Sequence, residues 1–254
     1  MAQPRIVSLL PSATEIAVAL GLGESLVGRS HECDYPLFVK ALPVVTSTRL
    51  EKGLTSRQID DRIQEIVRQG LSVYEVDTAL LRDLRPDLIL TQSQCAVCAV
   101  TPADLEEALG DWIGTAPTLL SLAPDTLEDV WSDFAKVAEA AGIPERASSV
   151  VGDLKERMSG LSRSSAERMD RPRVAAIEWI DPLMAAGNWV PELIEAAGGH
   201  PLFARAGEHS SWLNWDDLIA ADPDLIVAMP CGYLLPQTLA DLGSLVDHFG
   251  WKDL

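Results

Sequence analysis

The sequence contains the same arrangement of elements twice. Residues 84–91 read LRPDLILT, and residues 221–228 read ADPDLIVA. Each segment joins the end of an amphipathic helix to a Pro-Asp turn and a short apolar run, which is typical of a strand buried in a parallel sheet. Matching apolar runs lie upstream at residues 5–9 and 173–177, each followed by a loop and a helix that ends near a glycine. The repeat predicts two similar α/β lobes with a ligand held in the cleft between them.

Composition narrows the kinds of partner. The chain has 254 residues and is 47% apolar, which is enough for two modest cores. Its formal net charge of −18 argues against nucleic acid, because a phosphate backbone is bound by a basic face. No apolar run reaches the length of a transmembrane helix, so we expect no membrane insertion.

The first residues and the four cysteines bear on location. No long apolar stretch of the signal-peptide kind precedes the first strand pattern, which predicts a cytoplasmic protein, or a periplasmic one if a leader has been removed. In the cytoplasm, cysteines are more often reduced, metal-bound or catalytic than paired in structural disulfides.

Hydrophobic periodicity and punctuating Gly and Pro residues predict the elements. Ser12 or Thr14 is the expected N-cap of the first helix. The expected strands or extended segments are 5–10, 26–28, 42–45, 88–91, 118–122, 173–177 and 225–228. The expected helices are 12–20, 56–70, 77–84, 102–109, 126–141, 144–168, one ending at Gly198, 215–221 and 238–249.

These elements predict a domain organisation. We expect an N-terminal α/β lobe at 1–143, a linker helix at 144–169 and a C-terminal α/β lobe at 170–254. A second lobe that matched the first would need at least one more strand, so we expect the C-terminal lobe to be truncated. The fold class is α/β, with two Rossmann-like lobes, central parallel sheets and one long connecting helix.

Ligands of open α/β sheets bind beyond the carboxyl ends of the strands. The loops that follow the strands therefore supply the candidate ligand-binding residues. Among them, aromatic side chains offer a broad apolar face with one polar group, which suits a flat ligand, although core packing is the alternative. The candidates are Pro11, Ser12, Ala13, His31, Asp34, Tyr35, Gln92, Gln94, Glu178, Trp179, Asn188, Trp189, Trp212 and Tyr233.

All four cysteines also lie in these loops. Cys95 and Cys98 form a C-x-x-C pair, and Cys33 and Cys231 follow other strands. Three interpretations remain open. The cysteines are structural or line the ligand site, they hold an iron–sulfur cluster or zinc, or the C-x-x-C pair is a redox dithiol.

No catalytic constellation is recognisable. The Gly-x-Ser-x-Gly motif and the phosphate-binding glycine loops are absent from the sequence. We therefore expect a protein that is not an enzyme.

One family resemblance covers nearly the whole chain. Residues 5–16, RIVSLLPSATEI, followed by Gly21, Gly28 and the Asp34-Tyr35-Pro36 motif, resemble the opening of the periplasmic cobalamin-binding proteins that serve ABC importers. The two Pro-Asp-Leu-Ile segments, the stretch 187–199 and the stretch 211–224 also fit this family.

The resemblance implies a function. It implies two lobes joined by one long helix, a cobalamin or related corrinoid as ligand, and an importer permease as partner. Contacts would come from the loop at Pro11, from Tyr35 and from aromatic residues of the second lobe. A binding protein for another metal chelate, such as a siderophore, is an alternative. The lack of a leader and the cysteine-bearing loops depart from the family pattern, and a cytoplasmic metal or redox protein is the second alternative.

Overall fold

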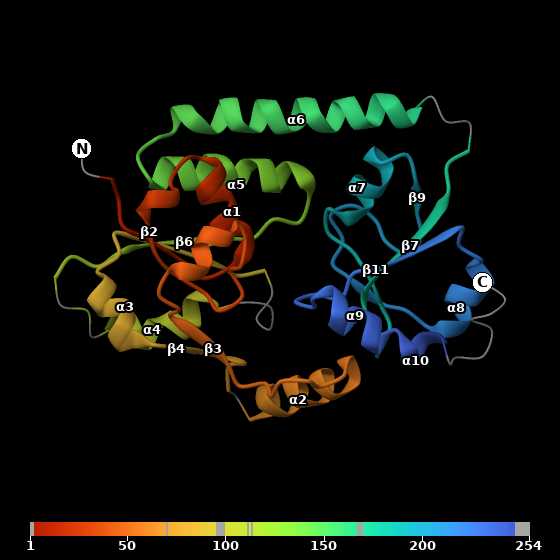
Figure 1. Cartoon of the computed structure of the whole chain (residues 1–254), viewed down its shortest axis with the longest axis horizontal. Coiled ribbons are helices and arrows are strands. Elements are labelled where there is room, and N and C mark those ends of the chain that lie inside the picture. Colours follow the sequence, from red (N-terminus) through yellow and green to blue (C-terminus); the bar gives the residue numbers. More distant parts are fainter. Residues whose placement is uncertain are drawn as a thin grey trace. The chain divides into compact units, whose positions relative to one another are not determined.

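The computed structural model describes residues 3–69, 71–94, 100–110, 112, 114–166 and 170–246 (Figure 1). Its strands are β1 (Ile6–Ser8), β2 (Leu26–Arg29), β3 (Thr46–Thr48), β4 (Tyr74–Val76), β5 (Leu88–Gln92), β6 (Thr118–Leu122), β7 (Arg173–Trp179), β8 (Met184–Ala185), β9 (His200–Pro201), β10 (Ser211–Trp212) and β11 (Leu225–Ala228). Its α-helices are α1 (Pro11–Ala19), α2 (Ser56–Arg68), α3 (Thr78–Leu84), α4 (Pro102–Gly110), α5 (Leu127–Ala140), α6 (Glu145–Ala166), α7 (Val190–Ala196), α8 (Trp215–Ala221), α9 (Leu235–Asp241) and α10 (Gly243–Val246). Two short 3-10 helices are η1 (Gly23–Ser25) and η2 (Leu37–Ala41).

The chain divides into two compact units. Unit 1 comprises residues 1–51, 63–124 and 128–153, and unit 2 comprises residues 52–62, 125–127 and 154–254. The division falls inside α6, the longest described helix, which forms where a linker helix was predicted. The amino-terminal part of α2 belongs to unit 2, although its neighbours in the sequence belong to unit 1.

Unit 1 is built on a four-stranded parallel sheet in the order β2-β1-β5-β6. The chain passes from β1 to β2 on one side and later returns to β5 on the other side of β1. This reversal is the topological switch point at which open α/β sheets bind ligands. A separate antiparallel pair joins β3 to β4, and neither strand was predicted at these residues.

Apolar residues cover both faces of this sheet. Val7 of β1 and Ile89 of β5 pack with Leu81 of α3 and Leu105 of α4 in one core cluster. Ile6 and the other alternate strand residues face the opposite way, as the two-residue period of a strand requires. The continuous apolar strands follow from burial on both faces.

Unit 2 has a mixed sheet in the order β10-β8-β7-β11, with β9 also paired to β7. The pairs of β7 with β9 and β11 are parallel, whereas β8 and β10 are antiparallel. The prediction of parallel strands is therefore confirmed for β7 and β11. The prediction that the second of them is buried was wrong, because β11 is an edge strand of the described sheet with Leu225 and Val227 exposed, and the short antiparallel strands were not predicted. One core cluster of this unit joins Ile177 of β7 to Leu218 of α8 and Leu245 of α10.

The sequence repeat corresponds to a repeat of structure. In unit 1, β1 and β5 are neighbours with Ile6 opposite Leu88, and in unit 2, β7 and β11 are neighbours with Val174 opposite Leu225. The helix before each second strand ends on a residue in the left-handed conformation, Arg85 with φ 45° and Asp222 with φ 43°.

Two local predictions were wrong. The first helix begins at Pro11 with Leu10 as its N-cap, so Ser12 and Thr14 lie inside the helix. Proline is favoured at the first helical position because its fixed φ suits the helix and its missing N–H has no partner there. The helix expected at 238–249 is two short helices, α9 and α10, and residues 247–249 lie outside the described part of the chain.

No helix in the described ranges combines the length and the apolar character that crossing a bilayer requires.

Candidate functional site

The predicted residues of unit 1 lie at one edge of its sheet. Pro11, Ser12 and Ala13 form the first turn of α1, directly after β1. Gln92 ends β5, and the loop that carries His31 follows β2. Because parallel strands end at the same edge, the sheet brings these segments together as predicted.

A buried hydrogen-bond network fixes this edge. The Thr14 hydroxyl lies 2.8 Å from Ser8 Oγ and 3.1 Å from the Cys33 sulfur, within hydrogen-bond distance of both. Cys33 itself is fully buried, and burial raises the pKa of its thiol. The network ties β1 and α1 to the loop after β2, so Cys33 has a structural place in unit 1.

His31 is held by Thr46. The Thr46 hydroxyl accepts from the His31 backbone N–H at 3.1 Å and lies 2.8 Å from Nδ1, while it donates to Ser30 Oγ at 3.2 Å. The hydrogen bond with Thr46 involves Nδ1, so Nε2 is the ring nitrogen outside this contact. Burial, and then the charge of Arg29, lower the pKa of His31 and favour its neutral form.

Acidic groups lie beside His31. Glu32 Oε1 is 4.0 Å from His31 Nε2 and accepts from the Tyr74 hydroxyl at 3.4 Å. Burial raises the pKa of Glu32. Burial, and then the charge of Asp34, also raise the pKa of Glu15 on α1. The edge therefore disfavours additional negative charge on a ligand.

Tyr35 is the most accessible aromatic candidate of unit 1. It is 62% exposed, and Leu37 and Phe38 beside it are 76% and 51% exposed. Asp34 lies 3.7 Å from Lys40 Nζ in the same loop. Large apolar side chains that cluster on a surface indicate a site that contacts a ligand or another molecule.

The two candidate glutamines of unit 1 are at least partly buried within the unit. Gln92 is buried, and the Gln94 side-chain amide donates to the carbonyl of Pro124. Cys95 and Cys98 lie outside the described residues.

In unit 2, the ends of β7 and β11 bring two aromatic candidates together. Trp179 and Tyr233 meet edge to face, with ring centroids 5.5 Å apart. The Tyr233 hydroxyl donates to Asp241 Oδ2 at 3.3 Å, and the same oxygen accepts from the Ser56 backbone N–H at 2.9 Å. Burial and the Asp241 charge raise the pKa of Tyr233 to about 12.

Glu178 is held in place by a residue that sequence reasoning missed. Ser210 Oγ donates to Glu178 Oε2 at 2.6 Å and accepts from the Gly187 N–H at 3.0 Å. Beyond β7, Arg57 of α2 forms an ion pair with Asp181. No sequence signal pointed to Ser210 or Arg57, because their partners are distant in sequence.

The remaining candidates of unit 2 differ in exposure. Asn188 adopts φ 52°, its N–H donates to the Glu208 carbonyl at 2.7 Å, and its Oδ1 is buried without a hydrogen bond in the described chain. Trp189 is half-buried at the start of α7, and Trp212 is 63% exposed on β10. Cys231 is also exposed, one turn beyond β11.

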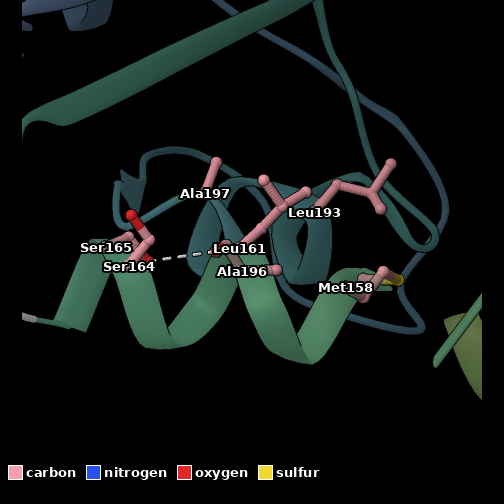
Figure 2. Close-up of a pocket in the computed structure, with 7 residues that line it drawn as sticks. All are labelled: Met158, Leu161, Ser164, Ser165, Leu193, Ala196 and Ala197. Atoms are coloured by element: carbon pink, nitrogen blue, oxygen red, sulfur yellow. Dashed lines mark hydrogen bonds between the residues drawn. The ribbon is translucent and has the colours of Figure 1, made fainter. Parts of the chain in front are cut away.

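No metal centre is found in the described residues, since no three His, Cys, Asp or Glu side chains gather as ligands there. Two hollows lie away from the candidate residues. Figure 2 shows one of about 340 Å³, where Leu161 of α6 faces Leu193 of α7 and Ser165 Oγ donates to the Ala196 carbonyl at 3.2 Å. The other, about 520 Å³, is lined by Arg82, Arg85, Trp112 and neighbouring residues at the amino-terminal edge of the unit 1 sheet.

Comparisons with known proteins place the chain in a family. The sequence model of the periplasmic binding proteins matches residues 6–253. The vitamin B12-binding protein of Vibrio parahaemolyticus is 24% identical and is aligned over 98% of this chain and 80% of its own length. The vitamin B12-binding protein of Yersinia pestis strain Pestoides F is 27% identical over 89% of this chain and 69% of its own length.

Solved structures show the same fold. The periplasmic vitamin B12-binding protein of Vibrio cholerae has a TM-score of 0.64 and 19% identity, with 99% of this chain and 85% of that chain covered. A periplasmic heme-binding protein from Roseiflexus has a TM-score of 0.69 and 25% identity, with the same coverage of 99% and 85%. These relatives are binding proteins rather than catalysts, and the match along almost the entire sequence shows that this chain belongs to the periplasmic binding protein family.

Proposed function

We propose that this protein is the substrate-binding component of an ABC importer and that its ligand is cobalamin or a related corrinoid. The curated relatives that match along most of the chain are vitamin B12-binding proteins, at 23–27% identity. These relatives support a corrinoid as the ligand, and the aromatic residues at the strand ends suit a large flat ring.

The observation that carries the proposal is the placement of aromatic groups at the strand ends of each unit. The exposed Tyr35 follows β2 in unit 1, and in unit 2 the half-buried Trp179, the last residue of β7, packs against Tyr233, which follows β11. A flat tetrapyrrole-like ring offers large apolar faces, which aromatic side chains cover with little loss of conformational entropy.

Heme is the second candidate ligand. Solved relatives with TM-scores of 0.66–0.69 are heme-binding proteins. In this chain, burial lowers the pKa of His31 and favours its neutral ring, and Thr46 bonds to Nδ1, so Nε2 is the nitrogen that could bind the iron of a heme. An iron–sulfur or zinc protein is not proposed, because the relatives give it no support.

The family also bears on location and partner. The expectation of a cytoplasmic location has no support from relatives that are periplasmic binding proteins, so we propose a periplasmic location. The partner would be an importer permease that receives the chelate.

The ligand can be identified by titrating the purified protein with cyanocobalamin, cobinamide and hemin, and following tryptophan quenching and the ligand's visible spectrum. We expect saturable binding of a corrinoid, weakened by Trp179→Ala and unchanged by Trp112→Phe. Trp112 is the matched control because it lines the hollow at the amino-terminal edge of the unit 1 sheet, at the other edge from the strand-end loops. Saturation by hemin alone would favour the second candidate, and no saturation by any of the three would contradict the proposal.

A further inference from the structure

The guanidinium of Arg29 holds together the loop that carries His31, Asp34 and Tyr35. Its Nη1 donates to the carbonyl oxygens of Ser30 at 3.0 Å, His31 at 3.4 Å and Cys33 at 3.0 Å. Its Nη2 donates to the carbonyl of Lys40 at 3.2 Å. One side chain therefore joins both ends of residues 30–40.

The backbone of Arg29 is fixed independently of its side chain. Its N–H donates to the Pro43 carbonyl at 2.9 Å, and its own carbonyl accepts from the Val45 N–H at 2.9 Å. The guanidinium thus extends from a strand that is anchored on both sides. Its Nε is buried without an acceptor in the described chain, a cost that the four carbonyl contacts offset.

The loop itself has little regular structure. The 3-10 turn of η2 is its only helical element among the described residues, and no described strand lies between Ser30 and Lys40. Outward, the loop presents Tyr35, Leu37 and Phe38. The backbone carbonyls of this loop therefore bind the Arg29 guanidinium, while its apolar side chains remain exposed. The guanidinium thus keeps these side chains in a position to contact a ligand.

We propose that Arg29 is a positioning residue of the ligand site, which preorganises the loop at 30–40 so that Tyr35 and its neighbours meet the ligand without further ordering. The inference rests on the proposed function for its ligand and on the Arg29 contacts for its mechanism. A loop that is ordered before binding loses less entropy on binding, which increases affinity. Lysine cannot replace arginine here, because an ammonium lacks the planar set of donors that reaches four carbonyls.

The test compares Arg29→Lys with a matched control, Arg5→Lys. Arg5 also donates to a backbone carbonyl, that of Leu84, at 2.9 and 2.7 Å, but it lies at the opposite edge of the same sheet. Hydrogen exchange of the backbone amides is measured in the absence of ligand, and cyanocobalamin affinity is measured by titration. For Arg29→Lys we expect faster exchange confined to residues 31–42 and an affinity loss of about tenfold or more, which corresponds to about 1.4 kcal/mol. For Arg5→Lys we expect neither.

A double variant separates positioning from general stability. If Arg29 acts through Tyr35, then Arg29→Lys combined with Tyr35→Ala weakens binding little more than Tyr35→Ala alone. Fully additive losses, an unchanged affinity in Arg29→Lys, or unchanged exchange of the loop would each overturn the inference. If the wild-type protein binds no chelate, the proposed function fails, and the exchange experiment alone decides whether Arg29 holds the loop.

Discussion

The backbone N–H of Arg173 donates a 2.7 Å hydrogen bond to Asp224 Oδ2, which ties the first residue of β7 to the turn before β11. The same bond joins the Arg5 N–H to Asp87 Oδ2 at 2.8 Å in unit 1. In both units the arginine side chain also donates to carbonyls at the end of the preceding helix, to Leu84 in one case and Asp222 in the other. In each unit, the aspartate of the repeated Pro-Asp turn therefore bonds to the arginine N–H at the start of the neighbouring parallel strand, a contact that we call the Pro-Asp clamp.

This clamp makes a prediction about stability. Replacing Asp224 with Ala removes the acceptor of the Arg173 amide. We expect a loss of about 1 kcal/mol in the free energy of unfolding, below the range for hydrogen bonds to charged groups because the site is exposed. Asp224→Asn keeps an acceptor and should lose less. Urea unfolding followed by circular dichroism measures both. Equal midpoints for wild type and Asp224→Ala would show that the clamp does not stabilise unit 2.

The environment of the Tyr233 hydroxyl should affect the stability of the protein at alkaline pH. Its pKa is raised from 10.0 to about 12, first by burial and then by the charge of Asp241. Because the folded pKa is above the unfolded one, this contribution to stability is fully present below pH 10 and is lost as the pH rises through about 12. Tyr233→Phe should remove this part of the alkaline destabilisation.

A spectroscopic titration checks the Tyr233 prediction directly. The chain has three tyrosines, so the tyrosinate absorbance that Tyr233→Phe removes can be resolved. It should titrate near pH 12. A difference spectrum that titrates near the ordinary value would contradict the predicted environment.

The two described cysteines should differ in reactivity. Cys33 is fully buried, and burial raises the pKa of its thiol, whereas Cys231 is exposed. Thiolates react with alkylating reagents far faster than thiols, and access is also required. We expect iodoacetamide to label Cys231 well before Cys33 in the folded protein and both in urea, as measured by mass spectrometry of the peptides. Comparable native rates would mean that the Thr14–Cys33 network opens readily.

The aromatic pair of unit 2 should contribute to ligand affinity. Truncating Trp179 removes one ring of the pair and its apolar face, and such aromatic contacts contribute about 0.5–1.5 kcal/mol beyond burial. Trp179→Ala should therefore lower corrinoid affinity by more than tenfold, and Trp179→Phe by less. An affinity that Trp179→Ala leaves unchanged, measured by fluorescence titration, would remove this residue from the site.

The buried strands β1, β5 and β7 were predictable because burial on both faces makes them continuous apolar runs. Helices such as α3 and α8 were predictable because they end at the Pro-Asp turns. The two-residue strands β8, β9 and β10 are too short for any period to be read. The first N-cap was misassigned because Ser12 and Pro11 are both helix-start signals, and proline was the correct one.

The loops of the candidate site were predictable, because the carboxyl ends of parallel strands lie at the same edge of a sheet. The contacts within those loops were not predictable. Nothing in the sequence shows that the Arg29 side chain turns back onto Lys40, or that Ser210 reaches Glu178, since both contacts depend on the folded chain.

The measurement that most directly tests the central claim is isothermal titration of the wild-type protein with cyanocobalamin, beside the double variant Tyr35→Ala/Trp179→Ala. The account predicts saturable binding at one corrinoid per chain for the wild type and a strong loss of affinity in a double variant that stays folded by circular dichroism. No heat of binding with cobalamin, or equal affinity in both proteins, would contradict a corrinoid site built from the strand-end loops.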